Sequence, residues 1–338
     1  MSAPESLAGT TAHAVETSVV VLNFNGREHL ELCLSSLLRQ THPSFEVILV
    51  DNGSTDGSAG YVRSAFPWVQ VIRLDHNVGF CGGNNAGIRA ARGRFIALLN
   101  NDTEVASAWL ESLSQAMRTN QQAGLCASRM MRFWERDVID NAGDLLASTG
   151  CALERGRGQT ESPEFGADCD VFGACAGAAL YRRSMLDEIG LLDERFFLTY
   201  EDLDLSFRAR LAGYGCVYVA DAVVYHKVRG TMAHFPSQQV FQSQRNIEWV
   251  WLKNMPASLM LKYLPQRLLY WLGSAWFFTR RGHGLTFLRA KLAALTGCIP
   301  VLKQRAQIQR SRRMTAEDFE RLLTRDWLPR KLAKFRAS

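Results

Sequence analysis

The chain has 338 residues, of which 47% are hydrophobic and 21% are charged. This composition is typical of a globular protein and excludes collagen-like, disulfide-scaffold and wholly disordered chains. The cysteines are scattered without a Cys-x-x-Cys pair, which argues against zinc-finger and thioredoxin-type sites and favours a reducing, cytosolic compartment. Residues 1–17 have neither a basic start nor an apolar core, so we expect a flexible tail rather than a signal peptide.

Charge divides the chain into two unlike regions. The net charge is +6, yet residues 249–338 alone contain 18 lysines and arginines against 4 acidic residues. The preceding residues are therefore net acidic. No acid occurs between Glu248 and Glu317, a stretch that contains twelve bases. Such asymmetry indicates a surface for anionic partners, either lipid headgroups or nucleic acid.

The acidic region alternates short apolar runs with amphipathic stretches, which predicts a mainly parallel α/β sheet. Continuous Val, Ile and Leu runs suit strands that are buried on both faces. These runs predict strands at residues 18–22, 45–50, 69–74 and 94–99. Helices are expected at residues 28–39, 59–65, 84–92 and 108–119.

Polar residues follow each expected strand, at the edge where an open parallel sheet binds its ligands. They include Asn23 and Asn25, Asp51, Asn77, and finally Asn101 and Asp102. Turn chemistry alone is the alternative for any one of these clusters. Turn chemistry explains less well why four such clusters lie on one edge.

A glycine-rich segment, residues 79–87, opens one of the expected helices. Because G-x-G-x-x-G after the first strand and G-x-x-x-x-G-K-[ST] are both absent, dehydrogenases and P-loop enzymes are not favoured. The segment includes Gly79 and Asn84, and its glycines permit a ligand to approach the backbone while the helix start offers amide donors. Tight packing of the helix on the sheet is the alternative.

Five segments in this order resemble the inverting glycosyltransferases of family 2. They are residues 18–25 (SVVVLNFN), 50–56 (VDNGSTD), 77–87 (NVGFCGGNNAG), 99–102 (LNND) and 192–214, which contains YEDLDL. The branch that they most resemble is rhamnosyltransferase-like and acts on cell-envelope glycans. The resemblance implies a GT-A type nucleotide-diphosphosugar transferase fold over residues 18–255. Its nucleotide-binding half would be residues 18–105 and its acceptor half residues 106–255.

The resemblance assigns the nucleotide-sugar donor to the polar edge. Asp51 matches the acid that contacts the nucleoside base, and Asn23 and Asn25 line the same pocket. An Asx-turn cap is the alternative for Asp51. Many relatives carry a second acid where Asn52 stands here. The other expected donor-binding residues are Asn77, Gly79, Asn84, Asn101, Asp102, Glu201 and Arg245.

The family's D-x-D metal motif corresponds to residues 100–102, where only Asp102 is acidic. Its later histidine corresponds to His226, for which a surface or capping role is the alternative. Together these residues predict a divalent cation, Mn²⁺ or Mg²⁺, that the donor diphosphate helps to hold.

Glu201 and Asp202 match the family's acidic pair, in which the second residue is the general base. An inverting transferase needs such a base because the acceptor hydroxyl loses its proton as it attacks the anomeric carbon. Asp202 and Asp204 would otherwise serve as first-turn acids of a helix that runs to Gly213. We expect catalysis from Asp202 and a structural role for Asp204.

Residues 242–246 (QSQRN) stand where processive polymerases of the family carry Q-x-x-R-W. Asn246 replaces the tryptophan, which favours transfer of a single sugar. Arg245 is expected to contact the diphosphate or an acceptor phosphate, with a surface arginine as the alternative.

Residues 256–338 are expected to form a basic amphipathic helical region. The apolar run at residues 257–278 contains Lys262 and Arg267, which disfavour a membrane span. We therefore expect an interfacial helix on an anionic membrane surface, with the protein cytoplasmic and peripheral to the inner face of the cell membrane. A helical pair packed on the body, or a homodimer contact, is the alternative.

These observations predict an inverting, metal-dependent transferase that moves one sugar to a glycan or polyprenyl-linked acceptor. The resemblance favours rhamnose from dTDP-rhamnose, with UDP-galactofuranose or UDP-glucose as alternative donors. A non-catalytic glycan- or membrane-binding scaffold is the alternative from another class. Nucleic-acid binding is not expected because no recognition motif accompanies the basic region.

Overall fold

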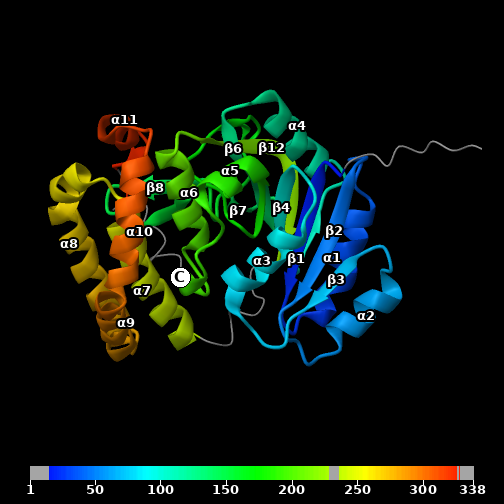
Figure 1. Ribbon diagram of the computed structural model, residues 1–338, viewed down its shortest axis with the longest axis horizontal. Helices are drawn as coiled ribbons and strands as arrows, with labels where there is room; N and C mark the ends of the chain where they lie inside the picture. The colour runs from blue at the N-terminus through cyan, green and yellow to red at the C-terminus, as the bar shows by residue number, and fades with distance from the viewer. Residues whose placement is uncertain (1–14, 228–235, 326, 328–338) are drawn as a thin grey trace, which may run out of the picture.

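The computed structural model describes residues 15–227, 236–325 and 327 (Figure 1). Residues 1–14 of the expected tail and residues 328–338 of the basic region lie outside them. The described chain forms a mainly parallel central sheet covered by helices on both faces, followed by a group of C-terminal helices. The expected mainly parallel α/β sheet with a helical C-terminal region is thus confirmed.

The central sheet has the strand order β10-β12-β6-β11-β4-β1-β2-β3. Residues 17–105 contribute four parallel strands: β1 (Thr17–Asn23), β2 (Phe45–Asp51), β3 (Gln70–Arg73) and β4 (Phe95–Asn100). The half formed by residues 106–255 adds β6 (Ala123–Arg132), β10 (Cys169–Asp170), β11 (Ala178–Arg182) and β12 (Gly215–His226). Strand β11 runs antiparallel between β4 and β6, whereas β12 is parallel to β6.

Alternate residues of each central strand serve two separate apolar layers. Val19 and Val21 pack in the layer that contains α1 (Arg27–Leu38), α2 (Ser58–Ala65) and α4 (Trp109–Thr119). Val20 points to the layer beneath α3 (Gly79–Ala90), α5 (Arg183–Ile189) and α6 (Glu201–Leu211). Burial on both faces explains why these strands read as continuous apolar runs.

Short strands extend the sheet beside β12 and β6. β5 (Thr103–Val105) pairs with β12, and β7 (Ile139–Asn141) pairs with β6. A second sheet joins β8 (Asp144–Ala147), β9 (Ala152–Glu154) and β13 (Leu323–Thr324). Two single-turn helices, η1 (Pro163–Phe165) and η2 (Glu194–Phe196), complete this half.

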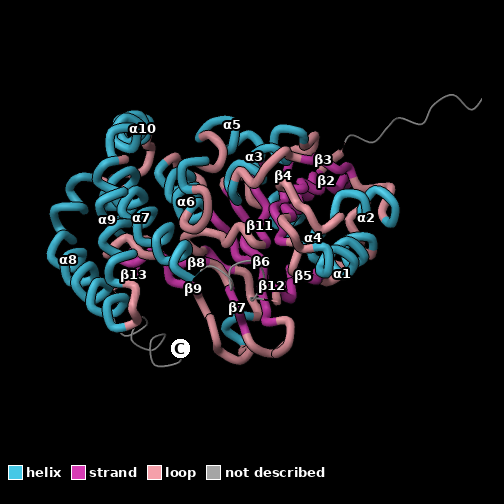
Figure 2. Tube along the Cα trace, turned by 90° about the horizontal axis from the view of Figure 1, so that it is seen from below, coloured by secondary structure: helices cyan, strands magenta, loops and turns pink. Residues whose placement is uncertain are grey.

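The C-terminal helices lie at the opposite end of the molecule from β3 (Figures 1 and 2). They are α7 (Pro236–Asn254), α8 (Ala257–Arg280), α9 (Gly284–Thr296), α10 (Cys298–Ser311) and α11 (Ala316–Arg321). Among the described residues no single helix is long and apolar enough to cross a membrane. The pair α9 and α10, bent by 58°, passes that test of length and composition only when taken together.

Candidate active site

The expected polar edge forms where strands β1, β2 and β4 end. The parallel register places Asn23 beside Asp51 and Leu22 beside Asn100. Asn23 donates through Nδ2 to Asp51 Oδ1 at 3.5 Å, and its Oδ1 accepts from Asn101 Nδ2 at 2.6 Å. Three clusters that are far apart in the sequence therefore meet, as the sheet topology predicts.

Asp51 keeps one oxygen available at this edge. Its side chain is buried, and Oδ2 has no hydrogen-bond partner among the described residues. The nearest cation is the Arg73 guanidinium, whose Nε lies 3.8 Å from that oxygen. A buried acceptor without a donor is costly, so the geometry suits a ligand that brings an N–H group.

Asn25 lies in the left-handed region, with φ of 51°, and joins the loops after β1 and β2. Its backbone N–H donates to Ser54 Oγ at 3.0 Å, and its Oδ1 accepts from the Thr55 N–H at 2.8 Å. A pocket of about 570 Å³ opens beside it, lined by Asn25, Arg27, Glu28, Glu31, Asp56 and Tyr61.

The glycine-rich segment is occupied by contacts within the protein. The N–H groups of Phe80 and Cys81 both donate to the Phe197 carbonyl, at 2.7 and 3.3 Å. Gly79 has φ of +81°, and a Cβ there would lie 2.5 Å from the Phe197 ring. Further along the helix, a Cβ on Gly83 or Gly87 would collide with apolar side chains of β1. Tight packing, the alternative to ligand binding, accounts for these contacts.

Two residues of this region that are expected to bind the nucleotide-sugar donor also have hydrogen-bond partners within the protein. Asn77 Oδ1 accepts from Asn52 Nδ2 at 3.0 Å and from the Gly79 N–H at 2.8 Å. Asn84 donates to the Phe80 carbonyl at 3.0 Å within its own helix. Contact of Asn77, Gly79 and Asn84 with the donor therefore stays a prediction.

Asp102 and His226 lie together, as the metal prediction requires. The pairing of β5 with β12 sets His226 opposite Thr103, and His226 Nε2 lies 3.4 Å from Asp102 Oδ1. Burial raises the pKa of Asp102, but the hydrogen bond and charge of His226 outweigh burial and leave that pKa below its ordinary value. Burial lowers the pKa of His226, but bonds to Asp102 and Asp140 prevail and raise it to about 9.

These two residues fit a divalent cation that is shared with a diphosphate. Across the described ranges no group of three or more His, Cys, Asp or Glu side chains converges as a ready metal site. One carboxylate and one imidazole are nevertheless a usual partial ligand set, because such ions often take remaining ligands from substrate phosphates and water. The donor set suits a cation that binds together with the nucleotide.

Glu201 and Asp202 open helix α6. Asp202 accepts from the N–H groups of Leu203 at 2.7 Å and Ala176 at 3.4 Å, and burial raises its pKa. Glu201 is buried, and its Oε2 has no hydrogen-bond partner within the described part of the chain. Burial and the charge of Asp202 raise the pKa of Glu201 well above its usual range.

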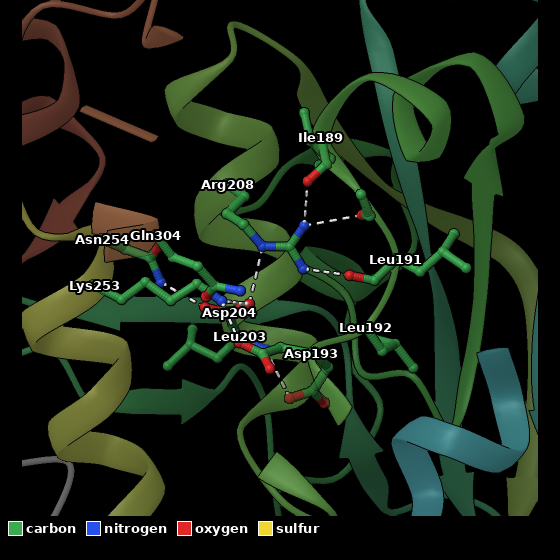
Figure 3. A network of polar contacts seen from close by, with 12 residues as sticks. Ile189, Leu191, Leu192, Asp193, Leu203, Asp204, Arg208, Lys253, Asn254 and Gln304 are labelled. Atoms are coloured by element: carbon green, nitrogen blue, oxygen red, sulfur yellow. Dashed lines mark hydrogen bonds and ion pairs between the residues drawn. The ribbon is translucent and has the colours of Figure 1, made fainter. Parts of the chain in front are cut away.

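Asp204 has the structural role that the sequence suggested (Figure 3). It is fully buried and accepts from Lys253 and Arg208, each at 2.9 Å, and from Asn254 at 2.8 Å. Burial raises the pKa of Asp204, but the charges of Lys253 and Arg208 outweigh burial and lower it. Arg208 also holds the carbonyls of Ile189, Gly190 and Leu191.

Arg245 has partners within the protein. Its Nη2 donates to the carbonyls of Arg195 and Phe196, at 3.0 and 3.2 Å, and its guanidinium lies 4.3 Å from the centre of the Trp249 ring. Its neighbour Asn246 is fully buried and donates to three carbonyls, those of Phe196, Leu198 and Thr199. Both residues brace the loop that precedes Asp202, and contact of Arg245 with the diphosphate stays a prediction.

Sequence reasoning missed two acids near the metal pair and the base. Asp140 Oδ2 lies 2.8 Å from His226 Nδ1. Asp144 is buried beside Asn141, and burial together with the charge of Asp202 raises its pKa to about 8. The only signal was a pair of acids around the Asn-Ala-Gly of residues 141–143, which resembles an ordinary turn.

Comparison with known sequences agrees with this geometry. The model of glycosyl transferase family 2 matches residues 18–190, which is more than half of the chain. An N-acetylglucosaminyl-diphospho-decaprenol L-rhamnosyltransferase of Mycobacterium tuberculosis is 27% identical over 266 residues, which cover 68% of this chain and 85% of the relative. The uncharacterized protein y4gI of Sinorhizobium fredii is 28% identical over 236 residues, covering 64% of this chain and 25% of its own length.

Solved structures share the fold at low sequence identity. A mannosyltransferase of Pyrobaculum calidifontis, in complex with GDP-Man and Mn²⁺, has a TM-score of 0.54 at 16% identity and covers 91% of this chain and 83% of its own. GalNAc-T7 with UDP, GalNAc and Mn²⁺ has a TM-score of 0.59 at 16% identity, over 75% of this chain and 50% of its own. Family match, fold and site together make this chain an enzyme that belongs to glycosyl transferase family 2.

Proposed function

We propose that the protein is an inverting, metal-dependent glycosyltransferase that moves a single sugar from a nucleotide-diphosphate donor to a glycan or polyprenyl-linked glycan. The observation that carries the proposal is the polar edge, where Asp51 Oδ2 has no hydrogen-bond partner among the described residues and Asp102 contacts His226. Asp202 is linked to the same edge, because it accepts from the Ala176 N–H while the carbonyl of Gly177 accepts from the Asn100 N–H. These groups supply base recognition, diphosphate neutralisation and proton removal.

Asp202 acts as the general base in this proposal. Burial raises the pKa of Asp202, which makes its carboxylate a better proton acceptor than that of an ordinary aspartate. The acceptor hydroxyl attacks the anomeric carbon and passes its proton to Asp202, while the bond from that carbon to the diphosphate oxygen breaks. The raised pKa of Glu201 favours its neutral form, so the pair presents one base.

Asp102 and His226 would hold the divalent cation, Mn²⁺ or Mg²⁺, beside the diphosphate. Such an ion offsets the charge that develops on the leaving group. Asp51, with Asn23 and Asn25, would orient the nucleoside, because a carboxylate accepts well from the imide N–H of a pyrimidine. Asn101, which is hydrogen-bonded to Asn23, extends the same surface.

The donor that we favour is dTDP-rhamnose, because the Mycobacterium tuberculosis relative is named for rhamnosyl transfer to a decaprenyl-linked acceptor. At 27% identity that relative leaves the sugar open, so UDP-galactofuranose and UDP-glucose remain the alternative donors. A scaffold without catalysis is the alternative from another class. The retained Asp202 and His226 count against it.

A donor panel tests the proposal. The purified protein is incubated with each nucleotide sugar, with and without Mn²⁺ or Mg²⁺, and nucleoside diphosphate release is measured. Asp202→Asn should lower turnover by roughly 100-fold or more with donor binding retained, as loss of a general base does. The exposed Asp221→Asn serves as the control. Equal turnover in Asp202→Asn would place the base elsewhere, and no activity with any donor would favour the scaffold.

We further propose that the protein binds peripherally to the anionic cytoplasmic face of the cell membrane through its C-terminal helices. Exposed aliphatic side chains recur at three- and four-residue spacing on α9 and run into α10, at Leu285, Leu288, Leu292, Leu295 and Ile299. Exposed bases, among them Arg280, Arg281 and Arg289, lie in the same acid-free stretch. Apolar insertion and attraction to anionic lipid favour the same surface.

A further inference from the structure

The imidazole of His226 lies between two carboxylates that come from separate parts of the chain. On one side, Nε2 lies 3.4 Å from Oδ1 of Asp102, which directly precedes β5. On the other side, Nδ1 lies 2.8 Å from Oδ2 of Asp140, which belongs to β7. Both carboxylates are buried, at 7% and 6% exposure.

The backbone around Asp140 fixes the position of its carboxylate. β7 pairs antiparallel with β6, and β6 pairs in turn with the end of β12 that carries His226. Ile139 is buried in the core, while Asn141 accepts from the Gly143 N–H and donates to Asp144. Neighbours on both sides therefore anchor the strand. The remaining charged group near Asp140 is Arg157, whose Nη2 lies 3.9 Å from Oδ1.

The contact between Asp140 and Nδ1 of His226 decides which ring nitrogen of His226 is free to bind a cation. An imidazole that ligates a metal uses the lone pair of one nitrogen and donates an N–H from the other. A carboxylate that accepts this second N–H fixes the tautomer and the ring orientation and raises the basicity of the ligand. Asp140 takes Nδ1, so Nε2 is the nitrogen left to bind a cation on the side of Asp102.

We propose that Asp140 is a positioning residue for the cation site, which it serves by holding His226 with Nε2 directed toward the cation shared with Asp102. It acts through His226 and does not touch the donor. This inference rests on the proposed function, because it requires that Asp102 and His226 hold the ion.

The experiment measures Mn²⁺ binding rather than turnover. Titration of Mn²⁺ into the full chain with saturating dTDP, followed by calorimetry or by the paramagnetic resonance signal of free Mn²⁺, gives the affinity of each variant. Asp140→Ala should weaken Mn²⁺ binding by about 10- to 100-fold, the usual loss for such an outer partner. The Mn²⁺ affinity of Asp140→Asn should lie between those of the wild type and Asp140→Ala, because the amide oxygen of the asparagine still accepts from Nδ1. Exposed Asp137→Asn, three residues away, is the matched control.

A double-mutant cycle separates positioning from a general structural effect. If Asp140 acts through His226, then Asp140→Ala should cause no further loss of affinity in a His226→Ala background. Equal additional loss in both backgrounds, or wild-type affinity in Asp140→Ala, would overturn the inference and leave the proposed function standing. Wild-type protein that shows no Mn²⁺ binding with dTDP, UDP or GDP would overturn the cation site itself. If Asp140→Ala does not fold, the same cycle is run with Asp140→Asn.

Discussion

Two buried carboxylate oxygens, Asp51 Oδ2 and Glu201 Oε2, have no hydrogen-bond partner among the residues that the structure describes. An unsatisfied buried acceptor costs about 1–3 kcal/mol, and more when it is charged. Both oxygens belong to residues that the motifs assign to donor binding. A cost of this size at two such positions fits groups that bind a ligand.

Asp51 gives the first prediction. Asp51→Ala should weaken binding of the nucleoside diphosphate by about 10- to 100-fold, because a hydrogen bond to a charged group is worth about 1.5–3 kcal/mol. Turnover at saturating donor should change little, since Asp51 is remote from the bond that breaks. Calorimetric titration with dTDP and UDP measures the loss. Exposed Asp75→Ala is the control, and unchanged affinity in Asp51→Ala would place the base-binding pocket elsewhere.

At the residue scale the sequence located side chains at the ends of the first parallel strands well and side chains of later elements poorly. Asn23, Asp51, Asn101 and Asp102 could be placed together because parallel strands bring their ends to one edge. Asp140 could not, because its partner is 86 residues away and nothing local marks the pairing of β7 with β6. The hydrogen-bond partners of Arg245 could not be predicted either, since they depend on the packing of α7.

The loop before helix α6 is the element on which the base depends. Phe197, Thr199 and Tyr200 have φ of 62°, 68° and 69°, a backbone region that costs a non-glycine residue about 1–3 kcal/mol. Asn246 offsets this cost by donating to the carbonyls of Phe196, Leu198 and Thr199. The sequence showed Asn246 only as a replacement for a tryptophan, and its bracing role follows from the fold.

Loss of the Asn246 side chain should displace the general base Asp202 more than it weakens binding of the nucleotide-sugar donor. We expect Asn246→Ala to lower kcat by at least tenfold with little change in the KM for the donor, and to cost about 3 kcal/mol of stability for three lost hydrogen bonds. Steady-state kinetics and thermal unfolding measure the two effects. Exposed Gln239→Ala on the same helix is the control. A variant with normal kcat would show that the loop holds its shape unaided.

The buried charges between α6 and α7 predict a pH dependence of stability. Burial raises the pKa of Asp204 and that of Asp193, but nearby cations outweigh burial and hold both below the ordinary value of 3.8. The cations are Lys253 and Arg208 at Asp204, and Arg195 and Lys253 at Asp193. A carboxyl whose pKa is depressed by folding stabilises the protein above its unfolded pKa, and this contribution is lost as pH falls below about 4. The melting temperature should therefore fall over that range.

Lys253→Met is the variant that tests this account. It removes one cation from each carboxylate, leaving Arg208 at Asp204 and Arg195 at Asp193, and should destabilise the protein by up to about 3–5 kcal/mol at neutral pH. Because the ionised carboxylates are then less stabilised, the fall in melting temperature below pH 4 should shrink in the variant. Melting curves of the wild type and of Lys253→Met across pH 3–7 show whether the response to acid differs. An acid response identical to that of the wild type would show that other carboxylates govern it.

At the scale of the whole molecule, the C-terminal helices are part of the folded body. Phe319 of α11 stacks on Phe207 of α6 with ring centres 4.9 Å apart, and β13 completes the small sheet. Several bases are used internally, as Arg267 and Lys291 both pair with Glu248. The sequence showed the amphipathic pattern and left open packing on the body or contact with a membrane. The described helices pack by one face and leave the leucines of the other exposed.

The exposed face of α9 can be tested without disturbing the packed one. A triple variant, Leu285→Gln, Leu288→Gln and Leu292→Gln, changes side chains that are 51–62% exposed and should fold normally. Its binding to anionic liposomes should weaken by roughly 100-fold, because full burial of one such side chain is worth about 1.5–3 kcal/mol and insertion at a headgroup boundary recovers part of that value. Truncation after residue 254 is a poorer test, because it would uncover the Phe207 contact.

Flotation with vesicles of graded anionic content, across a salt series, measures the effect. The wild-type protein should be partly released by salt, because charges are screened over about 10 Å at 0.1 M. A matched control is the pair Leu38→Gln and Trp134→Gln, which removes residues of 64% and 77% exposure from the body outside the C-terminal helices. If control and triple variant bind alike, the membrane contact lies elsewhere. If the wild type ignores vesicles and the triple variant instead changes from dimer to monomer in light scattering, this face joins two copies of the chain.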